Sequence, residues 1–469
     1  MEELTQKSLK KEIGLLDAIS IVVGSMVGSG IFIVGADIAR NTGSAGWFIA
    51  VWVIGGIMTL IAALSYGELS AMFPKAGGQY VYLKEAFNPL VAFVYGWSLF
   101  AVIQTGTIAA VGVSFFKFLA YFLPQFSEDI VFLSIGSFAV SPAQLASIGL
   151  IFLLTYLNTK GIKGGKIVQT IFTITKVLSI GGLIVFGFIH LKPTIWEQNW
   201  SDIWALKRIG TDGGITQYTN YPAFGGAIAS ALVGAIMSYE AWNNVTFVAG
   251  EIRNPKKNIG LSLIVGVLLV MTIYVLLNLM FTAVLPLIEI AGPEKDRVGI
   301  AAAQAVFGPV GTGFIAILIM VSTFGCNNGL IISGARVYYS MAQDGLFFKR
   351  SSRLNKHAVP AYALWLQSGM ASVLCLSGKY GDLLDMITFI AVFFYVLTII
   401  GIYILRVKKP DMERPYKAIG YPVLPAIYIL MGLSFCILLI IYKPNFTWPG
   451  LIIAMIGIPL FYLNKYRKV

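Results

Sequence analysis

The chain has 469 residues, of which 57% are apolar and only 12% are charged. A soluble domain is about one quarter charged, so these few charges cannot cover a surface that faces water, and most of the surface must face lipid. The net charge of +12 would suggest a nucleic-acid partner in a soluble protein. Here the basic residues lie in short segments between apolar runs, where they indicate membrane topology, and no nucleic-acid partner is expected.

The cysteines and histidines exclude several kinds of site. Cys326, Cys375 and Cys436 all lie inside apolar runs, and the two histidines lie near segment ends. This pattern argues against a disulfide framework, a zinc cluster and a nucleophile–base pair, so we expect no metal and no cofactor. Residues 1–12 are rich in charge, and the long apolar run that follows lacks a cleavage site, which indicates a tail rather than a signal peptide.

Apolar runs long enough to cross a bilayer follow one another along the chain. Because about 17–25 apolar residues cross the hydrocarbon core as a helix, the sequence predicts an all-α integral membrane protein with about twelve transmembrane helices. The expected spans are 13–40, 44–69, 88–120, 142–158, 167–190, 225–249, 259–285, 311–341, 360–377, 384–406, 422–442 and 447–464.

The distribution of lysine and arginine predicts the orientation of these spans. An even number of spans puts both termini on one side, and most of the basic residues fall in segments on that same side. Since basic residues concentrate in cytoplasmic loops, we expect a multi-pass plasma-membrane protein with both termini in the cytoplasm. The longest outer segment, about 191–224, is polar and is expected to lie as a loop over the outer face.

The first span contains three glycines within seven residues, Gly24, Gly28 and Gly30. Each glycine costs about 1 kcal/mol relative to alanine inside a helix, so we expect the helix to break in mid-bilayer. A break is tolerated there where it lines a protein cavity, and its free N–H and C=O groups attract a carboxylate and an ammonium respectively. The alternative is close helix packing through the small residues at positions 24 and 28.

Two ionisable residues lie inside later spans. Glu240 stands in an apolar run of the sixth span, next to Trp242, and an intramembrane carboxylate is a functional hypothesis by default. The alternative is a glutamate tied to a nearby group such as Gln104 or Asn243. Lys176 lies ten residues into the fifth span; it either tethers this span to backbone carbonyls or carries a proton.

Several segments then resemble one family. Five segments occur in the order of its motifs. They are Val27–Phe32 (VGSGIF), Tyr66–Leu69 followed by Pro74–Tyr82, Ile171–Thr173 ahead of Lys176, Trp242-Asn243 followed by Gly250–Pro255, and Arg414–Lys417 (RPYK). On these segments the chain resembles the amino acid–polyamine–organocation (APC) superfamily, and within it the L-type amino acid transporter (LAT) family and its bacterial relatives. The resemblance covers nearly the whole chain.

The resemblance implies a LeuT-type fold. Spans one to five (13–190) and six to ten (225–406) would form two inverted repeats with helices 1 and 6 broken. The expected organisation is a cytoplasmic tail at 1–12, a transport core at 13–406, and helices 11 and 12 with a cytoplasmic C-terminus at 407–469. A bundle of spans one, two, six and seven would rock against a scaffold.

The resemblance also implies site residues for an amino acid zwitterion. N–H groups near Ser29 and Gly30, with the Ser29 hydroxyl, would bind the substrate carboxylate. Carbonyls near Met26 and Val27, and near Met237 and Ser238, would receive the ammonium. The expected substrate-binding set is Met26, Val27, Gly28, Ser29, Gly30, Met237, Ser238, Glu240, Trp242 and Gln104, with Lys176 in coupling and with Glu251, Arg253 and Asp344 in an exposed cytoplasmic gate.

The sequence departs from the family pattern at two places. The sixth span has no glycine at 235–241, where a break is implied, and Gly234 is the nearest. Residues 121–141 contain no cysteine, so a disulfide-linked heavy subunit is not expected.

Several functions stay open at this point. We expect a secondary active transporter or exchanger of L-amino acids, with a proton as a possible coupled ion. A sodium-coupled transporter, with hydroxyls from Ser322 and Thr323 on the ion, or a transporter of polyamines or cationic amino acids, would have the same fold. An intramembrane enzyme would need a nucleophile and base or a metal set, which the sequence does not offer. A receptor or scaffold could share the fold.

Overall fold

The computed structural model describes Leu9 and residues 11–135, 138–210, 213–218, 220–292, 297–377 and 380–466. Most of the expected tail and the last three residues therefore lie outside the described part. Within it, ten helices are long and apolar enough to cross a membrane, and shorter apolar helices at Ala361–Leu376 and Thr447–Leu463 bring the set to about twelve. The predicted all-α membrane architecture is confirmed.

The first and third spans of the first half are composite. The elements are α1 (Leu15–Met26), α2 (Gly30–Ile33) and α3 (Gly35–Thr42) in the first span; α4 (Ala45–Met72) in the second; α5 (Gln79–Ala86) between spans; α6 (Pro89–Ser98), the π-helical η1 (Leu99–Ile103) and α7 (Gln104–Leu119) in the third; α8 (Pro142–Thr159) in the fourth; and α9 (Ile162–Ile189) in the fifth.

In the second half the sixth span is broken, and the long helix that contains the eighth span is kinked at Gly308, where φ is 68°, just before the span begins. The elements are α11 (Tyr221–Ser238), α12 (Asn244–Phe247) and η3 (Ala249–Glu251) in the sixth span; α13 (Pro255–Val284), α14 (Leu287–Ala291), α15 (Val298–Gln343), η5 (Lys349–Ser352), α16 (Ala361–Ser377), α17 (Tyr380–Lys408), α18 (Val423–Tyr442) and α19 (Pro444–Tyr466) after it.

Local sequence marks where several helices begin. Asn88 accepts a hydrogen bond from the Val91 N–H (3.0 Å), and Ser141 accepts one from the Gln144 N–H (3.3 Å). A proline follows each of these caps, where its missing N–H costs nothing. These caps fix the starts of the third span, which carries part of the cavity wall, and of the fourth span, which packs against it.

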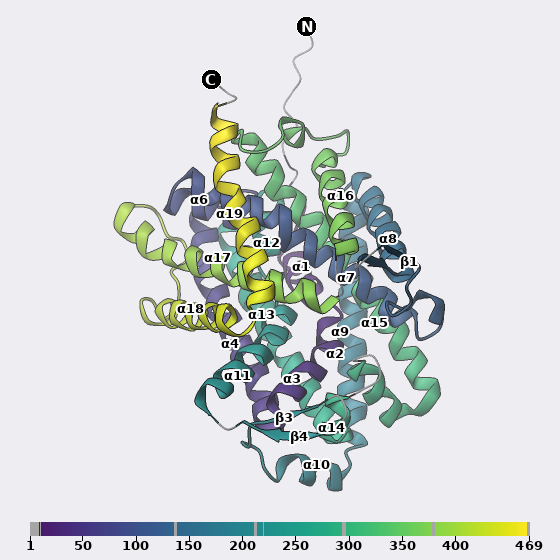
Figure 1. Ribbon diagram of the computed structural model, residues 1–469. Helices are drawn as coiled ribbons and strands as arrows, with labels where there is room; N and C mark the ends of the chain where they lie inside the picture. The colour runs from purple at the N-terminus through teal and green to yellow at the C-terminus, as the bar shows by residue number, and fades with distance from the viewer. Residues whose placement is uncertain are drawn as a thin grey trace.

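The segment expected as a plain outer loop is structured, so that prediction was too simple. It contains α10 (Pro193–Trp200) and an antiparallel hairpin of β3 (Lys207–Ile209) and β4 (Ile215–Gln217). Asn199 donates to the carbonyls of Thr282 and Leu285, which anchors α10 to the end of α13. Figure 1 shows α10, α14, β3 and β4 together at one end, opposite the C-terminal end of α19. A second hairpin, β1 (Leu133–Ile135) with β2 (Phe138–Val140), and the short η2 (Pro124–Phe126) follow α7.

The broken first span lies at the centre of the molecule. α1 packs against α13, α9 and α15, and α13 also packs along α4. The backbone of α1 is therefore enclosed by protein, as the break in a membrane-spanning helix requires.

Candidate functional site

The first span breaks where its glycines predict. α1 ends at Met26 and α2 begins at Gly30, so Val27, Gly28 and Ser29 form the connection. A Cβ on Gly28 would lie 3.1 Å from the Cys326 Sγ, and one on Gly30 would lie 2.9 Å from the Ser238 Oγ. Both glycines therefore permit a close approach between the break and its neighbours, and a side chain at either position would push them apart.

Lys176 caps the end of α1. Its Nζ donates to the carbonyls of Gly24 (2.8 Å), Val27 (2.7 Å) and Ser322 (3.2 Å). The last carbonyls of a helix have no intrahelical partner and attract a cation, which explains why a buried ammonium is stable here. The predicted contact between Lys176 and the carbonyls of the first span is confirmed. Its role in coupling stays a prediction.

Other groups complete the connections around the first break. The Ser322 hydroxyl donates to the Val27 carbonyl (3.1 Å), and the Cys326 thiol donates to the Ser25 carbonyl (3.0 Å). On the other side of the break the Ser29 hydroxyl donates to the Ser114 hydroxyl on α7 (2.7 Å). The carbonyl of Val27, expected as an acceptor for substrate, is thus already bonded by two protein donors.

The sixth span breaks without a glycine. α11 ends at Ser238 and α12 begins at Asn244, and between them Ala241 has a φ of 70°. This left-handed conformation is costly for any residue with a Cβ, so tertiary contacts hold it. Tyr274 on α13 supplies one: its hydroxyl lies 2.9 Å from the Met26 carbonyl oxygen and 3.0 Å from that of Ser238.

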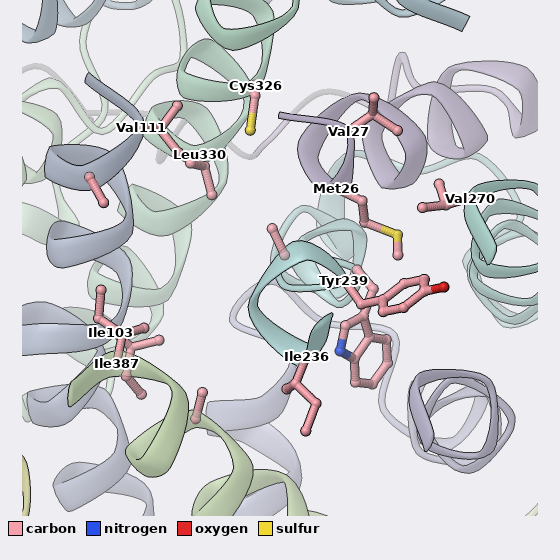
Figure 2. Close-up of a cluster of buried hydrophobic side chains, with 14 of the residues drawn as sticks. Met26, Val27, Ile103, Val111, Ile236, Tyr239, Val270, Cys326, Leu330 and Ile387 are labelled. Carbon is pink, nitrogen blue, oxygen red and sulfur yellow. The ribbon is translucent and has the colours of Figure 1, made fainter. Parts of the chain in front are cut away.

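A cavity of about 40 Å³ lies between the two breaks. At about 10–15 Å³ per water, it has room for a few waters, so the space between the breaks is too small for an amino acid in this conformation. Figure 2 shows Cys326, Val111 and Leu330 on one side of this region and Met26 and Tyr239 on the other. The lining residues are Ser25, Met26, Gly28, Ser29, Gly30, Val34, Thr107, Ala110, Val111, Met237, Ser238, Glu240, Ala241 and Cys326.

Glu240 lines this cavity, and its partner is Tyr395 on α17, whose hydroxyl donates to Oε1. The alternative of a glutamate tied to a nearby hydroxyl or amide is therefore met by the Tyr395 hydroxyl, whereas the two examples named from sequence bond elsewhere. Gln104 donates to the Leu330 carbonyl (2.8 Å), and Asn243 donates to Gln79 (3.1 Å). Gln104 lines a smaller cavity of about 10 Å³ that also reaches Glu240. Glu240 therefore separates the two cavities.

Trp242 lies behind the site rather than on the cavity wall. Its ring is buried and meets Tyr66 with ring centroids 4.7 Å apart and Tyr395 at 5.3 Å. Trp242 thus supports the tyrosine that contacts Glu240, and it does not line the main cavity that the two breaks enclose.

Glu251, expected in an exposed gate, is buried. Its Oε1 accepts from the Arg336 Nε at 3.0 Å, and both side chains are only 1% exposed. The expected exposure was wrong because α15 covers the end of the sixth span and supplies the arginine.

The N-terminal segment pairs through its backbone with the end of the sixth span. The Ile13 N–H donates to the Glu251 carbonyl, and the Arg253 N–H donates to the Ile13 carbonyl. Arg253 itself is exposed, and its side chain bonds the Lys11 carbonyl at 3.4 Å.

Asp344 belongs to a separate contact between α15 and α5. Its Oδ2 lies 2.7 Å from the Lys84 Nζ and accepts from the Tyr80 hydroxyl at 2.8 Å. Burial, and then the charge of Asp344, raise the pKa of Tyr80 well above its ordinary value, so this hydroxyl stays protonated and donates at physiological pH. The gate residues named from sequence therefore lie in two clusters and do not pair with one another.

Sequence reasoning missed several contributors: Ser114, Tyr274, Tyr395, Arg336, Lys84 and Tyr80. Arg336 was detectable, because an arginine inside the eighth apolar run breaks the same rule that identified Lys176. The serine and the tyrosines carry no such signal, since these residue types occur throughout apolar runs.

Comparison with known proteins adds a family and several relatives. A family model described as amino acid permease matches residues 13–461. The b(0,+)-type amino acid transporter 1 of Mus musculus is 28% identical over 469 residues, covering 99% of this chain and 90% of that protein. The Asc-type amino acid transporter 1 of Mus musculus is 27% identical over 471 residues (98% and 82%). The serine/threonine exchanger SteT of Bacillus subtilis (strain 168) is 28% identical over 463 residues (98% of both).

Proposed function

The chain belongs to the amino acid permease family and transports amino acids, and from that premise we propose that it exchanges small L-amino acids by alternating access to the cavity between its two helix breaks. The observation that carries this proposal is the convergence of the break after Met26 and the break after Ser238 on one cavity of about 40 Å³. The serine/threonine exchanger among the relatives favours a substrate with a small side chain.

The two ends of a zwitterion suit different parts of the breaks. The substrate carboxylate meets the N–H groups at Ser29 and Gly30, where α2 begins. The Ser29 hydroxyl donates to Ser114 in this conformation and must turn away from it to bind the carboxylate. The ammonium meets the carbonyls of Met26 and Ser238, which belong to residues of the cavity wall. Val27 is a poorer acceptor, because Lys176 and Ser322 both donate to its carbonyl, whereas the Met26 carbonyl accepts the Gly28 N–H and shares the single Tyr274 hydroxyl proton with Ser238. Exchange then follows rocking of α1, α4, α11 and α13 against α7, α8, α15 and α16.

The contacts of Lys176 favour exchange without sodium. Sodium coordination requires oxygen ligands without a competing cation. The Lys176 ammonium already lies within 3.2 Å of the carbonyl oxygens of Gly24, Val27 and Ser322. We therefore propose that Lys176 takes the position that sodium would need. The plasma membrane, with both termini in the cytoplasm, is the proposed location, and it rests on the distribution of basic residues.

Uptake into proteoliposomes tests the function. Purified protein is reconstituted with or without unlabelled L-serine inside, and uptake of labelled L-serine is measured with external sodium or with N-methyl-D-glucamine in its place. Fast uptake only into loaded vesicles, equal with both cations, is expected. Fast uptake into empty vesicles that needs sodium would instead establish a sodium-coupled transporter.

A further inference from the structure

The hydroxyl of Tyr274 is the only described side-chain group recorded within hydrogen-bond distance of carbonyls from both breaks. It lies 2.9 Å from the Met26 oxygen and 3.0 Å from the Ser238 oxygen, and the whole residue is buried. A tyrosine hydroxyl has one proton, whereas each carbonyl oxygen has two lone pairs. The Met26 oxygen also accepts from the Gly28 N–H at 2.9 Å. When the hydroxyl donates to Ser238, each of the two oxygens therefore keeps one lone pair.

The ring of Tyr274 is fixed by its neighbours. It packs edge-on against Trp52 on α4, with centroids 5.6 Å apart, and against Tyr239 at 5.0 Å. The Tyr239 hydroxyl in turn donates to the Trp52 carbonyl at 3.1 Å. These contacts join helices of the proposed moving bundle, so the hydroxyl keeps its position relative to both breaks while the bundle moves.

We propose that Tyr274 is a positioning residue. Its hydroxyl holds the carbonyl oxygens of Met26 and Ser238 close to each other, so that one substrate ammonium donates to both. The inference rests on the proposed function, because it assigns these two carbonyls to the ammonium. Tyr274 does not line the cavity; it acts through the carbonyls. An ammonium has three donors, so it can use the one lone pair that remains on each oxygen when the Gly28 N–H bonds to Met26 and the Tyr274 hydroxyl bonds to Ser238.

The test compares Tyr274→Phe with wild type in serine exchange. Without the hydroxyl the two carbonyls lose their common partner and the breaks are free to separate. The KM for serine is expected to rise about tenfold, which corresponds to about 1.4 kcal/mol, while the maximal exchange rate changes little. Tyr338→Phe is the matched control: this buried tyrosine donates to the Leu99 carbonyl at 3.4 Å, away from the cavity, and its loss should leave the KM unchanged.

The outcomes separate the inference from the function on which it rests. If wild type exchanges serine and Tyr274→Phe keeps the wild-type KM, the positioning role is wrong and the proposed function stands. An equal loss in both variants, or a lower maximal rate at unchanged KM, also overturns it, because either result indicates a general structural effect. If wild type exchanges no amino acid, the proposed function fails first. Should Tyr274→Phe not give monodisperse protein, Tyr274→Met removes the hydroxyl with a side chain that adapts to the space.

Discussion

Glu240 is the residue on which we expect substrate charge preference to depend. It lines the cavity beside Met237, and its carboxyl group accepts hydrogen bonds from the Tyr395 hydroxyl and from the Ala241 backbone N–H. Because we propose that backbone carbonyls of the two breaks receive the substrate ammonium, Glu240 is needed only for a polar or cationic substrate side chain. This makes Glu240 a candidate for substrate selection rather than for zwitterion binding.

Replacing Glu240 with glutamine tests that role. Breaking a desolvated charge pair costs several kcal/mol, so Glu240→Gln should weaken competition by lysine at least tenfold while alanine and serine still compete. Competition against labelled serine at two pH values measures this ranking, and Glu197→Gln on the exposed face of α10 is the control. If neutral uptake merely becomes less sensitive to pH, Glu240 acts as a protonated donor. An unchanged ranking at both pH values would make it structural.

Lys176 is expected to act as a tether. Its ammonium bonds three carbonyls, and a buried acceptor left without its donor costs about 1–3 kcal/mol. Lys176→Ala should therefore bind serine at least tenfold more weakly at every pH, as measured by equilibrium binding to purified protein. The exposed Lys192→Ala is the control. Loss of pH dependence with little loss of affinity would show a proton carrier instead, and wild-type behaviour in both respects would remove Lys176 from the mechanism.

At the scale of elements, the two breaks differ in how far sequence predicts them. Gly24, Gly28 and Gly30 made the first break visible, because glycine weakens a helix wherever it stands. The second break bends at Ala241, whose φ of 70° is imposed by contacts from other helices. A single sequence does not show such contacts. For the same reason the sequence did not predict the roles of Tyr274 and Tyr395 or the buried pairing of Glu251.

The end of the sixth span is expected to act as the inner gate. The buried pair of Glu251 and Arg336 ties α15 to this end, and the N-terminal segment at Ile13 pairs with it. Removing one partner of a buried pair is strongly destabilising, whereas exposed pairs contribute little. Glu251→Gln should therefore favour the conformation that is open to the cytoplasm.

Labelling of a cysteine below the site measures this shift. Ala391 lines the small cavity between Glu240 and Gln79, so Ala391→Cys should react with a cytoplasmic maleimide about tenfold faster when Glu251→Gln is present, a shift of about 1.4 kcal/mol. Glu85→Gln, which breaks the half-exposed pair with Lys409, should not change the rate. The protein without Ala391→Cys gives the baseline, since its three native cysteines are buried. Equal rates in all proteins would mean that the buried pair does not gate the site.

At the scale of the whole molecule, composition and hydrophobic length predicted the architecture because lipid imposes them on every span. The twelve expected spans lie close to the observed helices. The helix α10 and the hairpin of β3 and β4 were not predicted, because segments outside the membrane need no fixed apolar length. The family accounts for the shared core, and Glu240 with its tyrosine partner is where specificity is expected to differ.

Ligand-induced stabilisation tests most directly whether the joined breaks bind the substrate. Thermal unfolding of purified wild type, Gly28→Val and Gly149→Val is followed with each of the twenty amino acids and with polyamines. A Cβ on Gly28 meets Cys326, whereas one on Gly149 meets nothing within 4 Å. At about 100 times its dissociation constant, a small amino acid should stabilise wild type and Gly149→Val by about 2.7 kcal/mol and should leave folded Gly28→Val unaffected. Equal stabilisation of Gly28→Val would contradict a binding site at the helix breaks.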